Sequence, residues 1–297
     1  MPSFERILVA TDFSDTAAQA LRYALHFARH DHAEVHIAHV EEKEADGRGR
    51  RDASLREQVN EWMADVIASA NVADVRTSPV VLHGEEIAPA LTEYADEIAA
   101  DLIVIGTHGR RGLRRLVMGS VAEKIVRKAK RPVLAVRERE GVPPEPRMQH
   151  LLLPLDFSES SLRAIPYAKD LAARYQARLT AIHVFDDVDL PGFYGDFPNP
   201  LPIAAPEIEN KVRGTLREAV EAAPGPDVPV EFAVGRGAAP NVIVDEAENR
   251  EIDLVVMASH GQSGVERLLL GSVSEHVLRA APCPVLLVRV GRDEGKG

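Results

Sequence analysis

The chain has 297 residues, of which 45% are hydrophobic and 27% charged, as in an ordinary globular protein of about two domains. Its formal net charge of −11 argues against a general electrostatic grip on nucleic acid or on an anionic membrane. The one cysteine excludes an intrachain disulfide, and because no apolar run reaches the ~20 residues of a membrane span and no signal peptide is visible, we expect a cytoplasmic protein.

Short β-rich runs alternate with longer helical patterns along the first half of the chain. We expect strands at 6–11, 34–40, 75–82, 102–106 and 132–136, and helices at 16–29, 53–69, 87–99 and 121–129. Pro132, like Pro284 later on, suits the edge or first position of a strand. The alternation predicts an open, parallel, Rossmann-like α/β sheet of five strands, order 3-2-1-4-5, with helices on both faces.

The second half repeats the first. RERE followed by GVPPEPR predicts a short, stiff linker, after which LLLPLDFS repeats ILVATDFS. Asp156 follows Asp12 by 144 residues and His183 follows His39 by the same distance, whereas Gly271 follows Gly119 by 152. The spacing indicates a tandem duplication with a net insertion of eight residues, and predicts domains at 1–140 and 147–292.

Each half also carries a glycine loop, GTHGRRGLRRLVMGS from Gly106 and ASHGQSGVERLLLGS from Ala258. Gly106 and Gly109 can adopt positive φ and let the backbone approach a ligand. Gly119 and Ser120 open a helix whose first N–H groups favour a polyphosphate. Ser120 with Glu123, like Ser272 with Glu275, also fits a capping box, and we expect the cap and the phosphate site to be the same structure.

Asp12 lies at the end of the first predicted strand. In the order 3-2-1-4-5 it faces Gly106, at the end of the fourth strand, across the crevice where such sheets bind ligands. A carboxylate there can bind ribose or adenine, or hold a divalent cation beside phosphates, which makes Asp12 a candidate metal ligand. The alternative is that Asp12 caps the following helix.

These residues resemble the universal stress protein family. The G-2x-G-9x-G-[S/T] pattern of its ATP-binding members is matched in full by Gly106, Gly109, Gly119 and Ser120, and with the VATD start and PVLAV ending the resemblance covers both halves. It implies ATP, usually with Mg²⁺, bound between the first and fourth strands. It maps an adenine contact onto Val40, strand-tip contacts onto Ala10, Thr11 and Asp12, and phosphate contacts onto Gly109, Gly119, Ser120 and Val121.

The second copy keeps only part of the pattern. Its candidate residues are Asp156, Val184, Gly261, Gly271 and Ser272, but Ala258 replaces the first glycine, which is tolerable if φ there is negative. Its spacer has Gln262, Ser263, Glu266 and Arg267 where the first has Arg110, Arg111, Arg114 and Arg115. A lost guanidinium contact to phosphate costs ~1.5 to 3 kcal/mol if desolvated, so we expect the N-terminal site, with Arg110 as a contact, to bind ATP more tightly.

Other chemistry-bearing residues favour structural interpretations. His36 and His39 should face opposite sides of a strand, which suits no metal site, whereas His108 and His260 in the glycine loops are better ligand contacts. Cys283 suits a buried position before the last strand, and Trp62 the core face of a helix. Residues 186–207 form either a packed surface loop, a partner contact or a lid.

Three functions remain open: an ATP-binding stress-response regulator, a slow ATPase or phosphotransferase, and a nucleotide-free scaffold. Val121 follows Gly119 and Ser120, so no Walker A lysine is present, and Asp12 is the one evident general base. Binding is therefore favoured over turnover. The apolar final strands, PVLAV and PVLLV, suit sheet edges, where the two domains or two copies of the chain can pair.

Overall fold

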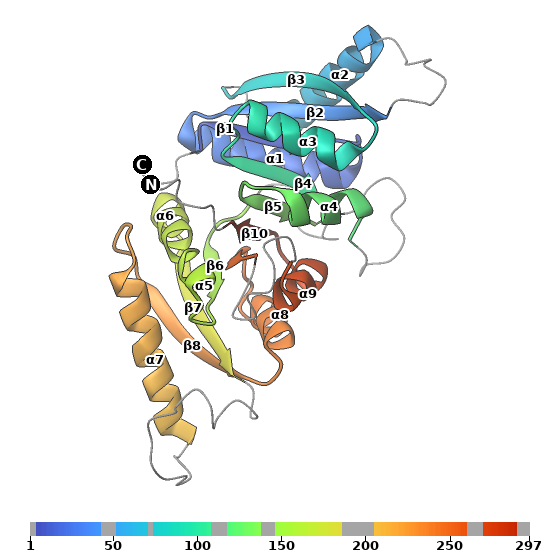
Figure 1. Cartoon of the computed structure of the whole chain (residues 1–297). Coiled ribbons are helices and arrows are strands. Elements are labelled where there is room, and N and C mark those ends of the chain that lie inside the picture. The colour runs from blue at the N-terminus through green and yellow to red at the C-terminus, as the bar shows by residue number, and fades with distance from the viewer. Residues whose placement is uncertain are drawn as a thin grey trace, which may run out of the picture. The chain divides into compact units, whose positions relative to one another are not determined.

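The computed structural model describes residues 4–42, 52–70, 74–107, 118–137, 146–185, 205–259 and 270–289. The chain divides into two compact units, residues 2–147 and 148–290 (Figure 1). The predicted domain limits at 140 and 292 lie outside the described residues, so these limits stay a prediction.

The first unit is a five-stranded parallel sheet flanked by four helices among its described residues. In chain order these are β1 (Arg6–Ala10), α1 (Asp15–Asp31), β2 (Glu34–Glu42), α2 (Asp52–Ala70), β3 (Arg76–Gly84), α3 (Ile87–Glu97), β4 (Leu102–Gly106), α4 (Ser120–Lys128) and β5 (Val133–Val136). The strands pair in the order β3-β2-β1-β4-β5. The predicted fold class and strand order are confirmed.

The second unit repeats this arrangement. Its elements are β6 (His150–Pro154), α5 (Glu159–Leu162), α6 (Ile165–Tyr175), β7 (Arg178–Phe185), α7 (Ala205–Ala222), β8 (Val230–Arg236), α8 (Ala239–Asn249), β9 (Leu254–Ala258), α9 (Ser272–Ala280) and β10 (Val285–Val288). The strand order β8-β7-β6-β9-β10 is again 3-2-1-4-5, with every pair parallel. Most of the 186–207 segment lies outside the described residues, and α7 begins at Ala205.

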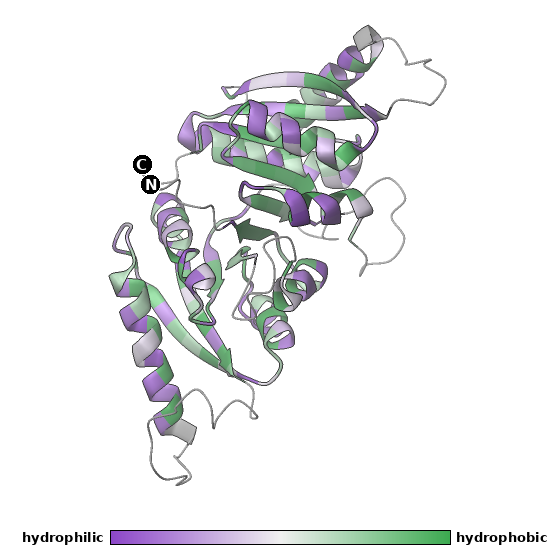
Figure 2. Ribbon diagram, in the orientation of Figure 1, coloured by the Kyte–Doolittle hydropathy of each residue, from purple (hydrophilic) through white to green (hydrophobic). Residues whose placement is uncertain are grey.

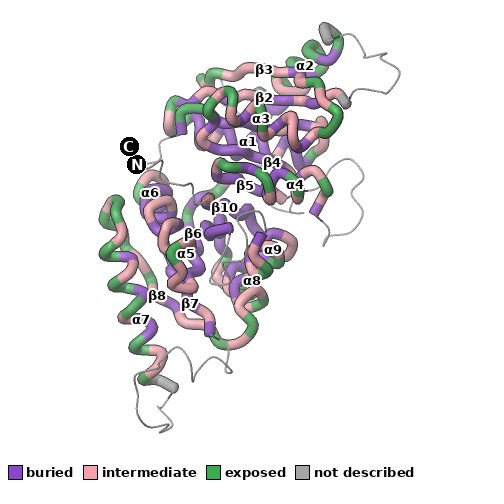
Figure 3. Tube along the Cα trace, viewed as in Figure 1, coloured by how far each residue is buried: buried purple, intermediate pink, exposed green. Residues whose placement is uncertain are grey.

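Apolar residues run without interruption along the central strands. Residues 7–9 of β1 and 102–105 of β4 are all buried. Because α1 contacts α2 and α3 contacts α4, a helix pair covers each face of the sheet. A parallel sheet covered on both faces favours continuous apolar runs over alternation, which is the pattern of hydrophobic, buried strands in Figures 2 and 3. Cys283 is buried two residues before β10, as expected.

One proline distinguishes the two units. α1 runs unbroken for 17 residues, whereas the corresponding segment of the second unit is divided into α5 and α6. Pro166 lies in the first turn of α6, and a proline has no N–H to donate to the preceding turn. Arg22 holds the corresponding position in α1, so the helix there continues.

Lys169 joins α6 to the end of α7. Its side chain is buried, and Nζ donates to the carbonyl oxygens of Val220 at 3.4 Å and Ala223 at 3.0 Å. Lys169→Met removes both hydrogen bonds to the carbonyl oxygens at the end of α7, so we expect it to lower the free energy of unfolding by about 1 kcal/mol. Urea unfolding followed by circular dichroism measures this change. Lys211→Met, at an exposed position on α7, is the matched control, and an equal effect of the two variants would contradict the prediction.

Candidate functional site

The carboxyl ends of β1 and β4 mark the candidate site of the first unit. The two strands are neighbours, and Val9 pairs in register with Val104, so the chain leaves the sheet after Ala10 and after Gly106 at nearly the same level. α1 contacts α2 and α4 contacts α3, so the helices that follow the two strands lie on opposite faces. This is the switch point at which open α/β sheets bind ligands, and Asp12 and Gly106 lie at or just beyond the ends of its two neighbouring strands.

The turn after β1 is held by its own side chains. The hydroxyl oxygen of Thr11 accepts from Phe13 N at 3.0 Å, and Asp12 Oδ1 accepts from Ser14 N at 3.1 Å. Ser14 is the N-cap of α1, and its Oγ accepts from Ala17 N at 3.2 Å. The alternative that Asp12 caps the helix is therefore wrong: Ser14 is the cap, and Asp12 shapes the turn before it.

The second unit repeats this turn after β6. Asp156 Oδ1 accepts from Ser158 N at 3.0 Å and from Ser158 Oγ at 2.6 Å, while Ser158 caps α5 by accepting from Ser161 N at 3.1 Å. Phe157 has φ of 61° and Phe13 has φ of 64°, both in the left-handed region that L residues with large side chains avoid. Two copies of one strained turn therefore stand at equivalent strand tips.

Two histidines whose spacing marks the repeat, His39 and His183, form hydrogen bonds to these turns. His39 Nδ1 lies 2.9 Å from Thr11 O, and His183 Nδ1 lies 2.7 Å from Leu155 O. Since a carbonyl oxygen can only accept, each Nδ1 carries the proton. Each ring also stacks on the left-handed phenylalanine, with centroids 4.6 Å apart in both units. The common 144-residue offset of the histidine and the phenylalanine is the sequence signal that could have found them.

Burial lowers the pKa of the His183 imidazole, against the opposing effects of its hydrogen bond to Leu155 and the charge of Asp156. The unfolded chain therefore binds the proton more readily below about pH 6.5, so stability falls as the pH drops from about 7 toward 5. We expect His183→Asn to make this fall shallower. Urea unfolding at a series of pH values measures the slope. His276→Asn, at an exposed histidine of the same unit, is the control, and an unchanged slope in His183→Asn would contradict the prediction.

Gly119, not Ser120, is the N-cap of the helix after the first glycine loop. Gly119 is the N-cap of α4 with φ of −61° and ψ of 147°, Ser120 is the first helical residue, and the N-cap residue itself has no side chain to cap the end. Glu123 instead binds Arg127, one turn later. The capping box expected at Ser120 and Glu123 is therefore wrong, because Gly119 is the last residue with extended backbone angles.

The second loop ends in the same way. Gly271 is the N-cap of α9, Ser272 is its first residue, and Glu275 binds Arg279. The capping box expected at Ser272 and Glu275 is also wrong, for the same reason. In both units the glycine N–H bonds to the residue that follows the strand: Gly119 N donates to Thr107 O at 2.8 Å, and Gly271 N donates to Ser259 O at 3.0 Å. The start of each helix thus lies beside the end of β4 or β9.

Gly106 lies against α1 at the end of β4. Its φ is not positive, because it is the last residue of β4. A Cβ at this position would lie 2.9 Å from Thr16 Cγ2 and 3.2 Å from the Thr16 carbonyl carbon. Gly106 therefore does not use the positive φ that is open to a glycine, and the close approach of α1 is one reason for a glycine at this position. Ala258, at the end of β9, also lacks a positive φ, so its methyl group is tolerated there.

The other predicted residues are placed as follows. Ala10, half-buried, ends β1; Val40 is buried in β2, and Val184 is half-buried in β7; Val121, half-buried, is the second residue of α4. Ser120 and Ser272 are exposed. The remaining residues lie outside the described ranges: Gly109, Arg110, Gly261, His108, His260 and the two spacers with their arginines.

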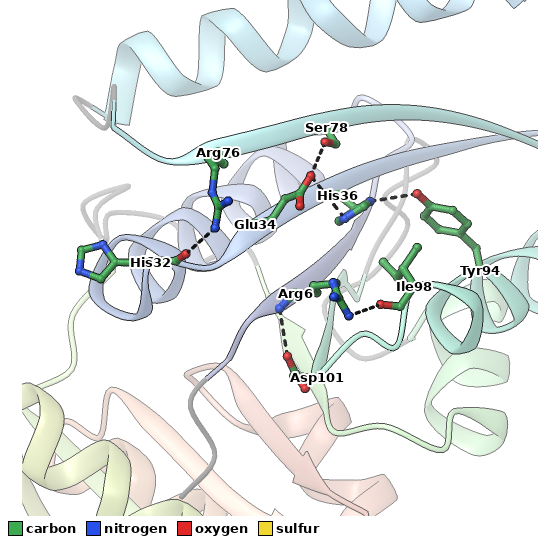
Figure 4. Close-up of polar contacts among 9 residues, drawn as sticks. All are labelled: Arg6, His32, Glu34, His36, Arg76, Ser78, Tyr94, Ile98 and Asp101. Carbon is green, nitrogen blue, oxygen red and sulfur yellow. Dashed lines mark hydrogen bonds and ion pairs between the residues drawn. The ribbon is translucent and has the colours of Figure 1, made fainter.

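His36 and His39 lie on opposite faces of β2, as predicted. His36 Nδ1 lies 2.9 Å from the Tyr94 hydroxyl on α3, in the polar network of Figure 4. Burial lowers the pKa of His36. On the other face, the Phe13 ring that stacks on His39 also meets the half-buried Trp62 of α2 edge-on, with centroids 5.9 Å apart. The network of Figure 4 includes Arg6, at the start of β1, and so lies away from the strand tips.

Arg289 is a cation that sequence reasoning missed. It directly follows β10, and its Nη1 donates to Ser259 Oγ at 3.4 Å, beside the carbonyl that holds Gly271. Burial lowers its pKa to about 10, so it stays charged at neutral pH. Arg137 holds the equivalent position after β5, and this shared offset of 152 residues is the signal in the sequence.

The described residues offer Asp12 no preformed set of metal ligands. Among the residues that the structure describes, no three His, Cys, Asp or Glu side chains are grouped so as to hold a metal ion. A cation at Asp12 would therefore take its other ligands from outside this described set, as Mg²⁺ does when it binds water and phosphate oxygens. In the same described ranges, no helix is both long and apolar enough to cross a membrane.

The family model for universal stress proteins matches residues 3–137 and, a second time, residues 148–289. The chain belongs to the universal stress protein family. The two matches make it a tandem member, and the resemblance noted at the glycine loops and strand tips is confirmed.

The sequence matches to related universal stress proteins cover only part of each chain. A universal stress protein of Mycobacterium tuberculosis is 34% identical over 204 residues, a match that covers 68% of this chain and 65% of that relative. One from Mycolicibacterium smegmatis is 32% identical over 235 residues, covering 78% of this chain and 75% of the relative. A solved universal stress protein of Archaeoglobus fulgidus has a TM-score of 0.65 at 21% identity, over 96% of this chain and 98% of its own, which shows a shared fold.

Proposed function

We propose that this protein is an ATP-binding regulator of the stress response, with nucleotide bound at the strand tips and glycine loops of its tandem domains. The observation that carries the proposal is Gly119. Its backbone angles suit any residue, and the nearest described atom to a Cβ there is Thr107 O, at an ordinary 3.5 Å. The described fold does not require a glycine at this position, whereas the close approach of a phosphate to the first N–H groups of α4 would favour one.

The other residues have roles that follow from their placement. In the first unit, Val40 contacts adenine, Ala10, Thr11 and Asp12 contact the nucleotide at the β1 tip, and Gly109, Arg110, Gly119, Ser120 and Val121 contact phosphates. Gly106 supports the site by allowing α1 close to β4. Asp156, Val184, Gly261, Gly271 and Ser272 are the counterparts in the second unit. Mg²⁺ binds with ATP, held by its phosphates and by Asp12.

Isothermal titration with ATP and Mg²⁺ tests this proposal, and the chain supplies a second signal. Trp62 is the one tryptophan of the sequence, and it contacts Phe13 in the turn that carries Asp12. ATP binding in the first unit should therefore change the emission of Trp62. The absence of both heat and an emission change, in protein freed of copurified nucleotide, would reject ATP binding.

The first site should bind ATP more tightly, because its spacer has four arginines where the second has one. Titration of Gly119→Asp and Gly271→Asp measures each remaining site alone. Equal affinities, or loss of the tighter binding in Gly271→Asp rather than in Gly119→Asp, would contradict the ranking.

Two alternatives are tested with the same protein. A slow ATPase or phosphotransferase would release product from ATP and Mg²⁺ faster than Gly119→Asp does. A nucleotide-free scaffold would contain no nucleotide by mass spectrometry as purified and would give no titration signal. The lack of a Walker A lysine after Gly119 favours binding over either turnover route.

The proposal also includes location and assembly. A reducing compartment such as the cytoplasm suits a chain whose one cysteine is buried. Pairing through the final strands, within the chain or between copies, stays a prediction, and size-exclusion chromatography with light scattering measures the stoichiometry.

A further inference from the structure

The histidine near the end of the second strand makes the same hydrogen bond in both units. It donates through Nδ1 to the carbonyl of the residue that precedes the aspartate, at 2.9 Å for His39 and 2.7 Å for His183. The backbone pairing of β1 with β2 continues to Thr11 N, which donates to Ala38 O at 2.9 Å. The next bond across the two strands is therefore made by the imidazole.

The same ring packs against the strained residue of the turn. Phe13 and Phe157 have φ of 64° and 61°, a conformation that costs a residue with a Cβ on the order of 1–2 kcal/mol. The histidine rings stack on them at 4.6 Å with interplanar angles of 36° and 34°. One side chain thus fixes the residues on either side of Asp12, and its counterpart does so for Asp156.

The position of Asp12 depends on these two neighbouring residues. Its Oδ1 accepts from Ser14 N, a bond that spans Phe13 and its left-handed backbone angles. The histidine interacts with neighbours of the aspartate on both sides, so a change of the ring changes where the carboxylate points.

We propose that His39 and His183 are positioning residues for the nucleotide, each holding the strand-tip turn so that its aspartate meets the ligand. The proposal rests on the proposed function, since it concerns the same site. It adds to each site one histidine on the second strand of that unit. It also predicts that each unit positions its aspartate in this way independently of the other.

The test isolates one site at a time. In Gly271→Asp protein, where only the first site remains, His39→Ala should weaken ATP binding about tenfold, the effect of losing one typical net hydrogen bond. His39→Asn should restore most of the affinity, because its amide can donate to Thr11 O without an imidazole. His36→Ala, on the opposite face of the same strand, should bind ATP as its parent does. In Gly119→Asp protein, His183→Ala and His183→Asn should behave in the same way at the second site.

A measurement without nucleotide separates this proposal from the proposed function. Amide hydrogen exchange should speed up at residues 11–17 in His39→Ala but not in His36→Ala. Unchanged exchange and unchanged affinity in His39→Ala would overturn the positioning role, as would His39→Asn being as weak as His39→Ala in a folded protein. If the parent binds no ATP while the exchange pattern holds, the proposed function fails and the histidines only stabilise the turn.

Discussion

Replacing Gly119 with aspartate should abolish ATP binding in the first unit and leave its fold intact. The Cβ of the new side chain meets no described atom closer than 3.5 Å, and φ of −61° is open to aspartate. Aspartate is also a favoured N-cap residue, so the start of α4 should be as stable as before or more so. The carboxylate, however, takes the place of the ligand phosphate at the helix start and repels it, a like-charge contact that costs several kcal/mol, or at least about a hundredfold in affinity.

Titration with ATP and Mg²⁺, together with Trp62 emission, measures the loss. Gly214→Asp is the matched control, because Gly214 lies on α7 with open space around its Cβ position. Gly119→Ala completes the series: a methyl group adds no charge and should weaken binding less. Binding within about threefold of wild type in Gly119→Asp would contradict a phosphate at this helix end.

The strand order and the position of Asp12 could be predicted because they follow from long-range rules that a repeat makes visible. Two copies of one alternating pattern indicate a parallel sheet, and its switch point then places Asp12 near the end of β4. The N-cap residue of α4 could not be predicted from the sequence in the same way. Ser120 and Glu123 have the spacing of a capping box, but which residue is last in extended conformation depends on how Gly119 N bonds to Thr107 O.

The roles of His39 and Gly106 were hidden for a related reason. His39 binds Thr11 only because β1 and β2 pair in the register that aligns Ala10 with Ala38. Gly106 is needed because Thr16, 90 residues earlier, packs against it. A local pattern marks such residues as unusual, but the contact that explains them comes from the tertiary fold.

Gly106→Ala should destabilise the first unit by about 2 kcal/mol, because the new methyl group overlaps the Thr16 side chain and backbone. The second unit indicates how the contact can be relieved. There the residue at the end of the fourth strand is Ala258, and the helix residue equivalent to Thr16 is Ser160, which lacks the methyl group nearest the clash. The unit with the larger residue on the strand, Ala258, thus has the smaller residue on the helix, Ser160.

This pairing predicts that Thr16→Ser rescues Gly106→Ala. Urea unfolding followed by Trp62 emission, which reports on the first unit, should show a coupling of about 1 kcal/mol or more between the two changes, and strictly additive effects would contradict the packing explanation. ATP titration of the rescued double variant then separates two reasons for the glycine. If the variant is stable and binds ATP, Gly106 serves the contact between α1 and β4, and Ala258 is no defect in the second site. If it is stable but fails to bind, the ligand itself needs the space, and the second unit should be the weaker site for that reason as well as for its spacer.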